Sequence, residues 1–219
     1  MTQYIDICWT LFYSNTTFDF IDYVVKERQP ADMAKYIRLK GWHKTRLGHL
    51  LNMAAFKITG HDLYREYAIS MLRGMGREEI EQLAGSFVAT LQNRRIPQVW
   101  SLIDMTGHNI LLSSTIEPVA KAVSALIHSS YLATELEYHN DICTGRILRD
   151  RLITKTGTLQ DIERPFHVIT DNLTDIDLIG QAEHSFIVTY GNRQRWESRL
   201  KKHRITGGIT FIPARERRY

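Results

Sequence analysis

Three short apolar segments, far apart in the chain, each lead to a polar side chain that is capable of chemistry. Residues 3–7 carry Asp6 at their end, residues 109–112 are followed by Ser113, and residues 166–170 are followed by Asp171. Helical periodicity separates these segments, and strands that alternate with helices are typical of a parallel α/β sheet. Ligands bind to such sheets beyond the carboxyl ends of the strands. We therefore expect Asp6, Ser113 and Asp171 to lie at one site.

The rest of the chain divides by its periodicity. Residues 16–95 are expected to be wholly helical, because apolar side chains recur three and four positions apart and no strand pattern interrupts them. We predict an α/β fold, a three-layer Rossmann-like core with a parallel sheet, in which residues 1–15 and 97–219 form the core and residues 16–96 form an inserted helical unit. The later elements predicted are helix 99–105, a helix ending near 127, a hairpin of 131–138 with 142–148, and a last short strand at 186–188.

Composition places the chain among ordinary globular proteins. It has 219 residues, 43% of them hydrophobic and 24% charged, which is enough to bury a core. The net charge of +4 suits an anionic ligand but is too small to predict nucleic-acid binding. Its two cysteines do not make a disulfide framework, so we expect a cytoplasmic protein. No signal peptide and no transmembrane segment are predicted.

Four motifs follow one another along the chain. They are Asp6-Ile7-Cys8-Trp9-Thr10-Leu11, residues 109–118 (NILLSSTIEP), the Thr144-Gly145-Arg146 hairpin followed by Lys155, and residues 168–178 (VITDNLTDIDL). Their order and spacing resemble the haloacid dehalogenase (HAD) superfamily, and most closely its phosphoserine-phosphatase-like branch (subfamily IB). In that branch a helical C1-type cap is inserted soon after the first motif. The resemblance covers essentially the whole chain, and it implies that residues 16–96 are such a cap.

The resemblance implies a role for each motif in phosphoryl transfer. Asp6 would be the nucleophile that forms an aspartyl-phosphate, since a carboxylate can split one difficult step into two easier ones. The cofactor would be Mg²⁺, which prefers oxygen ligands. Its ligands would be Asp6, Asp171, Asp175 and the backbone carbonyl of Cys8. The residues that bind the phosphoryl group would be Ser113, Ser114 and Lys155.

Each motif also has a plainer interpretation. A strand-end aspartate such as Asp6 can satisfy the amides of a turn, and Ser114 or Thr115 can cap a helix. Lysines usually lie on the surface. The residues that could replace Lys155 are Arg149 and Arg151. These interpretations do not explain why acidic residues stand at two separate strand ends.

Cys8 departs from the family pattern, which has a second aspartate at this position as general acid and base. General acid–base catalysis typically contributes about 10²–10⁴-fold to the rate, and a thiol is a poorer hydrogen-bond former than a carboxyl group. Cys8 therefore predicts slow turnover, a long-lived aspartyl-phosphate, or reliance on substrates with good leaving groups. Two functions stay open: a Mg²⁺-dependent hydrolase of a small phosphomonoester, and a catalytically impaired HAD-like protein that binds a phosphorylated ligand or a protein partner.

The sequence leaves the substrate open. Phosphoserine phosphatases have an acidic residue soon after the first motif, and residues 12–17 contain none, so phosphoserine itself is disfavoured. Phe12 and Tyr13 can stack on a ring or pack at the hinge of the cap. Four cations of the helical unit can attract a second anionic group or form an exposed helix face. They are Arg38, Lys40, Lys44 and Arg46.

Overall fold

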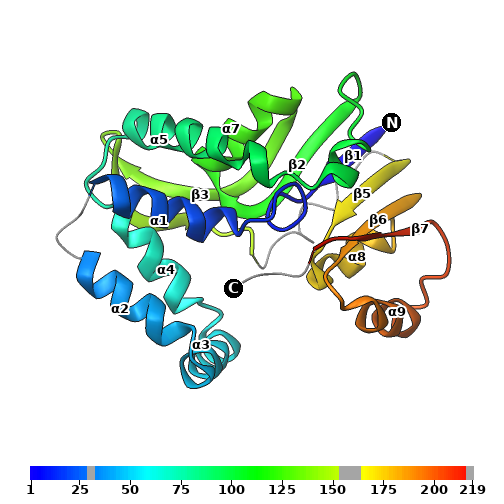
Figure 1. Cartoon of the computed structure of the whole chain (residues 1–219), viewed down its shortest axis with the longest axis horizontal. Coiled ribbons are helices and arrows are strands. Elements are labelled where there is room, and N and C mark those ends of the chain that lie inside the picture. The colour runs from blue at the N-terminus through cyan, green and yellow to red at the C-terminus, as the bar shows by residue number, and fades with distance from the viewer. Residues whose placement is uncertain (29–32, 153–163, 216–219) are drawn as a thin grey trace.

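A seven-stranded sheet forms the centre of the computed structural model, which describes residues 1–28, 33–152 and 164–215 (Figure 1). The strand order is β4-β3-β2-β1-β5-β6-β7. β3 and β4 are antiparallel, and the other neighbouring pairs are parallel. The strands are β1 (Thr2–Ile5), β2 (His108–Ile116), β3 (Ser130–His139), β4 (Ile142–Arg149), β5 (Phe166–Thr170), β6 (His184–Thr189) and β7 (Ile209–Pro213).

Helices cover both faces of this sheet. They are α1 (Thr16–Arg28), α2 (Met33–His43), α3 (Arg46–Thr59), α4 (Leu63–Ile69), α5 (Arg77–Thr90), α6 (Pro97–Trp100), α7 (Glu117–Ile127), α8 (Ile176–Ile179) and α9 (Arg193–Lys202). Short 3₁₀ turns at η1 (Ser70–Leu72), η2 (Leu91–Arg94) and η4 (Leu173–Asp175) join some of them. Within the described ranges, no helix has the length and apolar character needed to span a bilayer.

Alternating side chains of the central strands build two cores. Ile5 and Ile169 belong to a buried cluster shared with α1, α5 and α7, whereas Tyr4 and Val168 belong to a second cluster shared with α8 and α9. Successive side chains of a strand point to opposite faces, so each strand contributes to both clusters. The result is the three-layer α/β architecture that the sequence predicts.

The helical segment between β1 and β2 has two parts with different surroundings. The helices α1 and α5 bury their apolar side chains in the cluster that also contains Ile5. The helices α2 and α3 lie away from the sheet (Figure 1), and their buried residues are Tyr36 and Gly48. The division of the chain at residues 15 and 97 stays a prediction, because one hydrophobic cluster runs through both units.

The structure differs from the predicted elements in three places. The strand at 186–188 is not the last, because β7 follows it and pairs with β6. Only one residue of this five-residue edge strand is buried, whereas β1 and β5 are almost wholly buried, so its pattern in the sequence is weaker. The helix predicted at 99–105 is the shorter α6. The strand expected at residues 109–112 is the longer β2, which continues through Ser113 to Ile116.

Candidate active site

Asp6 and Asp171 lie at adjoining strand ends. Asp6 follows β1 and Asp171 follows β5, and these parallel strands pair with Ile5 opposite Ile169. The backbone N–H of Asp6 donates to the carbonyl of Ile169 at 2.9 Å. Both aspartates are buried. The topology thus brings together two carboxylates that are far apart in the sequence, as predicted.

Thr10 connects the two loops that carry these aspartates. Its hydroxyl accepts a hydrogen bond from the backbone N–H of Asp171 at 3.0 Å and donates to a carboxylate oxygen of Asp171 at 3.3 Å. Thr10 is fully buried. The turn before it has Trp9 at φ 55°, and the carbonyl of Trp9 accepts a 2.6 Å bond from the Tyr190 hydroxyl. The Thr10 contacts hold the first motif against the fourth, and the Trp9 contact holds it against the residue that follows β6.

The Cys8 thiol belongs to a chain of hydroxyl groups. Its sulfur lies 2.9 Å from Oγ1 of Thr16, which lies 2.8 Å from Oγ1 of Thr115. Burial raises the pKa of the Cys8 thiol, and the neighbouring Asp6 charge raises it further, against the opposing effect of the Thr16 hydrogen bond. The neutral thiol is therefore the favoured form, and it connects the first motif to the end of β2.

One cavity of about 460 Å³ contains much of the predicted site. Of the predicted residues, its walls include Asp6, Cys8, Ser114 and Asp171. Other walls are Trp9, Asn15, Thr17, Phe18, Asp62, Arg65, Leu152, Asn172, Leu173, Thr174, Asn192 and Arg195. Because the predicted residues come from the ends of three neighbouring strands, the cavity lies at the carboxyl edge of the sheet, where α/β proteins bind ligands.

The comparisons with known proteins agree with this geometry. The model of the haloacid dehalogenase-like hydrolase family matches residues 6–179, which include the helical segment and both buried aspartates. The chain belongs to this family. The HAD-like resemblance in the four motifs is therefore confirmed at the level of the family. A comparison with curated proteins gave no match.

Solved structures share the HAD-like fold of this chain. A protein of unknown function from Bordetella pertussis Tohama I has a TM-score of 0.69 at 14% identity, over 96% of this chain and 97% of that one. A probable phosphoserine phosphatase from Vibrio cholerae has a TM-score of 0.55 at 11% identity, over 95% and 68%. Cytosolic 5'-nucleotidase IIIB bound to cytidine has a TM-score of 0.58 at 11% identity, over 98% and 81%.

The other predicted residues lie around the cavity or outside the described ranges. Ser113 is fully buried, and its hydroxyl accepts from the backbone N–H of Thr115 at 3.3 Å, so it does not line the cavity. Asp175 is buried and accepts a 2.7 Å bond from the Thr170 hydroxyl. Lys155 lies outside the described residues. The roles assigned to these three residues stay predictions.

The helix-cap interpretation of the second motif is wrong, and the two arginines that could replace Lys155 have other partners. Helix α7 begins after Ile116 and has no side-chain cap, so neither Ser114 nor Thr115 caps it. Both arginines that could replace Lys155 form ion pairs with Glu135, Arg149 at 3.0 Å and Arg151 at 3.7 Å. Their charges are thus directed to a carboxylate of β3.

Arg65 is a cavity residue that the motif analysis missed. Its guanidinium donates 2.8 Å bonds to the carboxylate of Asp150, the carbonyl of Ser114 and the hydroxyl of Thr134. The side chain is only 5% exposed. A signal was present in the sequence, since Arg65 shares a helical stripe with Ala68, Ile69 and Leu72. An arginine on a buried stripe requires partners, because a buried charge is costly when unpaired.

The carboxylates of the cavity fit a Mg²⁺ ion. Within residues 1–28, 33–152 and 164–215, no three His, Cys, Asp or Glu side chains are placed to hold a metal together. Mg²⁺ does not need such a cage, because it keeps several waters and is commonly bound through one or two carboxylates and the phosphate of a substrate. Asp6 and Asp171 line one cavity and provide this donor set.

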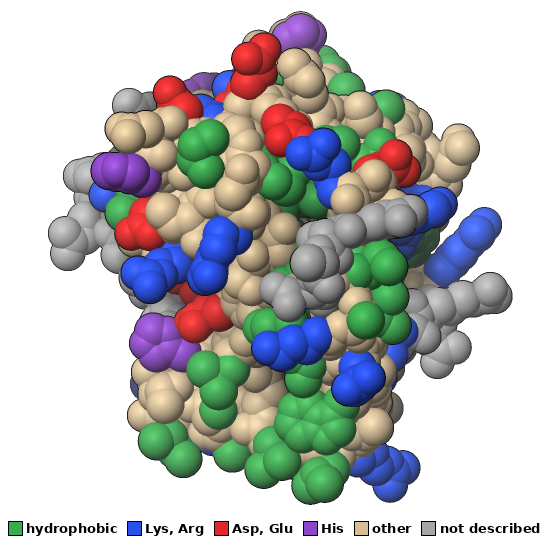
Figure 2. Space-filling model, turned by 90° about the vertical axis from the view of Figure 1, so that its left-hand side faces the viewer, with side chains coloured by type: hydrophobic (Ala, Val, Ile, Leu, Met, Phe, Trp, Pro, Cys, Tyr) green, Lys and Arg blue, Asp and Glu red, His purple; other side chains and the backbone are tan. Residues whose placement is uncertain are grey.

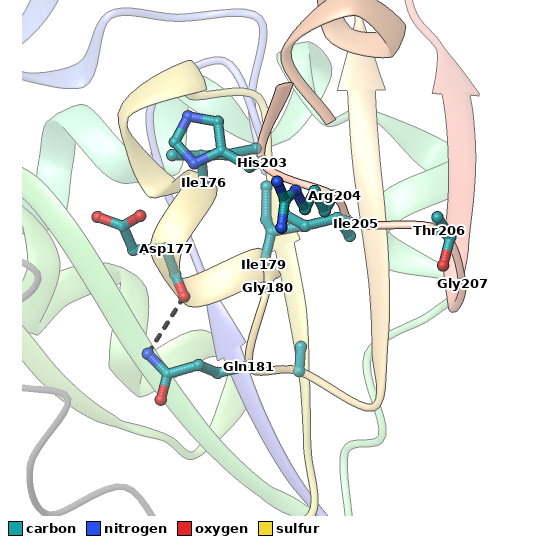
Figure 3. A pocket seen from close by; sticks show the side chains of 11 residues that line it. Ile176, Asp177, Ile179, Gly180, Gln181, His203, Arg204, Ile205, Thr206 and Gly207 are labelled. Carbon is teal, nitrogen blue, oxygen red and sulfur yellow. Dashed lines mark hydrogen bonds between the residues drawn. The ribbon is translucent and has the colours of Figure 1, made fainter. Parts of the chain in front are cut away.

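A second cavity, of about 580 Å³, is lined by the side chains drawn in Figure 3. Its walls are residues of α8 and of the loops that precede β6 and β7. The Gln181 side-chain amide donates to the carbonyl of Asp177 at 3.2 Å beside it (Figure 3). Although it is larger, this cavity lies at the amino ends of the strands and contains none of the four motifs' strand-end aspartates. The cavity at Asp6 is therefore the candidate active site.

Proposed function

We propose that this HAD-like protein is a Mg²⁺-dependent phosphatase that hydrolyses a small phosphomonoester through an aspartyl-phosphate on Asp6. The observation that carries the proposal is the position of Asp6 and Asp171, which end two adjoining parallel strands and line the same cavity. A cavity of about 460 Å³ has the size of a small-molecule site.

The proposed reaction has two steps. A carboxylate oxygen of Asp6 bonds to phosphorus while the bond from phosphorus to the ester oxygen breaks, and the departing oxygen takes up a proton. Water then attacks the aspartyl-phosphate, which releases inorganic phosphate and restores the Asp6 carboxylate. Bound Mg²⁺ would neutralise negative charge at the phosphoryl oxygens. Asp6 and Asp171 would hold it, with the backbone carbonyl of Cys8 as a proposed third ligand.

Other residues of the cavity suit a phosphorylated ligand. Arg195 and two asparagines, Asn172 and Asn192, line its wall and can donate to phosphate oxygens. Ser114 lines the cavity, and Lys155 is proposed to approach the phosphoryl group. We propose that residues 16–96 act as the cap, because Phe18, Asp62 and Arg65 of this segment form part of the wall.

Cys8 favours a second candidate function, in which the protein binds a phosphorylated ligand or a protein partner with little turnover. The thiol lines the cavity and its pKa is raised, so it can donate a proton to a leaving group but is a poor base for activating water. The two functions share one site and differ in the rate of dephosphorylation. Two free cysteines are consistent with a reducing compartment, and we propose a cytoplasmic location.

Release of phosphate from p-nitrophenyl phosphate tests the proposal. We expect Mg²⁺-dependent release by the natural protein and a loss of at least about 10³-fold in kcat for Asp6→Asn, since the nucleophile is removed. The matched control is Asp177→Asn, which makes the same change at an exposed position and should keep the rate. Equal rates for Asp6→Asn and the natural protein would refute the mechanism. Binding of phosphate without turnover would support the second function.

A further inference from the structure

The helices α2 and α3 expose an unusual number of large apolar side chains. Each of the following is at least 42% exposed: Ile37, Trp42, Leu47, Leu50, Leu51, Met53 and Ile58. Single exposed apolar side chains are normal on soluble proteins, whereas a contiguous group marks an interaction site. The helices α2 and α3, with the turn that joins them, form a helical hairpin, which we call the α2–α3 hairpin. We call the surface formed by these seven residues the hairpin face.

In α3 the apolar stripe points outward. Leu47, Leu50, Leu51 and Ile58 stand at positions i, i+3, i+4 and i+11, which is one side of a helix. The buried residue of α3 is Gly48, where a Cβ atom would lie 2.3 Å from the carbonyl oxygen of Trp42. The close contact between α2 and α3 is therefore made at the glycine, and the leucine side of α3 is left exposed. This is the reverse of an ordinary amphipathic surface helix.

The charged side chains of the α2–α3 hairpin are all positive. Residues 33–61 contain no aspartate or glutamate, and their cations are Lys35, Arg38, Lys40, Lys44, Arg46 and Lys57. Lys40 pairs with Asp22 of α1, and the other five side chains are exposed. Figure 2 shows hydrophobic side chains gathered on the lower part of this side of the molecule, over α2 and α3, with Lys and Arg side chains beside them. The surface is thus apolar and basic together.

Charge decides which occupant fits this surface. A second copy of the chain would bring five exposed cations against five more without an acidic residue in either hairpin, which opposes self-association. The cavities lined by Asp6, Tyr13, Gly145 and Ile176 include no residue of α2 or α3, so this face takes no part in those sites. An anionic lipid surface accepts both the apolar stripe and the cations.

We propose that the α2–α3 hairpin docks the protein on the surface of an anionic lipid bilayer. The apolar side chains of the hairpin face enter the boundary between headgroups and acyl chains, and Trp42 lies at the headgroup level that tryptophan prefers. Lys44, in the turn between the two helices, and Arg46, the first residue of α3, contact anionic headgroups. This inference does not depend on the proposed phosphatase activity.

Sedimentation with vesicles tests the proposal directly on the full chain. The probes are vesicles of phosphatidylcholine alone and of phosphatidylcholine mixed with phosphatidylglycerol. We expect binding to the mixed vesicles that falls at high salt, and binding at least about tenfold weaker to the neutral vesicles, because lysine and arginine near an anionic surface each add to the attraction. Leu51→Glu and Lys44→Glu/Arg46→Glu should each weaken binding at least about tenfold.

Matched variants control for nonspecific effects. Leu148→Glu changes a leucine on β4 that is 65% exposed, more than Leu51 at 51%. Lys201→Glu/Lys202→Glu reverses two exposed charges on α9. Both variants should bind vesicles like the natural protein. Circular dichroism verifies that each variant is folded. The proposal is overturned if the natural protein binds neither vesicle, if Leu51→Glu and Leu148→Glu bind alike, or if light scattering shows that Leu51→Glu abolishes a dimer while vesicles stay unbound.

Discussion

Thr10 and Asp171 are joined by two hydrogen bonds, one in each direction, although they are 161 positions apart in the chain. The Thr10 hydroxyl receives the backbone N–H of Asp171 and donates to its carboxylate. This contact links the loop after β1 to the loop after β5. It holds the side chain of Asp171, which lines the cavity, whereas Thr10 itself does not line it.

Thr10→Val should loosen this link. The substitution keeps the shape but leaves a buried N–H of Asp171 without its acceptor, which costs about 1–3 kcal/mol. We expect a lower midpoint of urea unfolding. Thr10→Ser retains the hydroxyl and should recover most of the loss. Equal midpoints for the valine variant and the natural protein would show that the bond contributes nothing to stability.

Asp171→Asn should weaken the response of the protein to Mg²⁺. If Asp6 and Asp171 bind the ion, adding Mg²⁺ raises the melting temperature, since a ligand that binds only the folded state stabilises it. Loss of one carboxylate should reduce this rise. Asp177→Asn, at an exposed position six residues further on, should keep it. A rise of the same size in both variants would place the ion elsewhere.

Cys8→Asp should accelerate hydrolysis of p-nitrophenyl phosphate. A carboxyl group can act as both general acid and general base, and such catalysis is worth about 10²–10⁴-fold. Cys8→Ser keeps the position polar without providing a base and should not reproduce the gain. The measurement is kcat at saturating Mg²⁺. An aspartate variant no faster than the natural protein would show that Cys8 does not occupy an impaired acid–base position.

Arg65→Met should destabilise the fold strongly. The methionine fills part of the space but leaves a carboxylate, a carbonyl and a hydroxyl without their donor, at a cost of about 2–4 kcal/mol. The control is Arg149→Met, which removes a pair whose arginine is 61% exposed and should cost about 0–1 kcal/mol. The measurement is the free energy of unfolding of both variants in urea. Similar costs for the two would mean that the burial of Arg65 adds nothing.

The stability of the protein should fall in alkaline solution through buried tyrosines. Burial raises the pKa of Tyr36, and likewise raises the pKa of Tyr64 to about 12. Above pH ~10 the unfolded tyrosines release protons that the folded ones retain, so unfolding is favoured by up to about 1.4 kcal/mol per pH unit for each tyrosine. Below that pH the contribution is fully present.

Tyr36→Phe isolates one of these contributions. The variant loses the 2.8 Å bond from the Tyr36 hydroxyl to Asp22 at every pH, but its urea midpoint should decline less steeply above pH ~10. Midpoints at neutral and alkaline pH give the two slopes. Parallel curves for the variant and the natural protein would exclude Tyr36 as a source of alkaline sensitivity.

Much of the active site could be predicted from the sequence because its signals are local. A short apolar segment that ends in an aspartate can be recognised in the sequence. Alternation of strands with helices predicts a parallel sheet, in which the carboxyl ends of the strands lie on the same side. Asp6 and Asp171 follow from this argument alone. The edge strand β7 was missed because it lacks this signal: only one of its five residues is buried, and a proline ends it.

The amino-acid sequence by itself determined the family, the parallel α/β sheet and the strand ends that carry the two carboxylates. Only the tertiary structure decided the partners of Arg65, the contact of Cys8 with Thr16, and the outward direction of the apolar stripe of α3. The physical reason is that periodicity fixes which side chains share a helix face or a strand end. Long-range packing decides whether that face contacts the core or solvent. The apolar face of α3 is exposed to solvent.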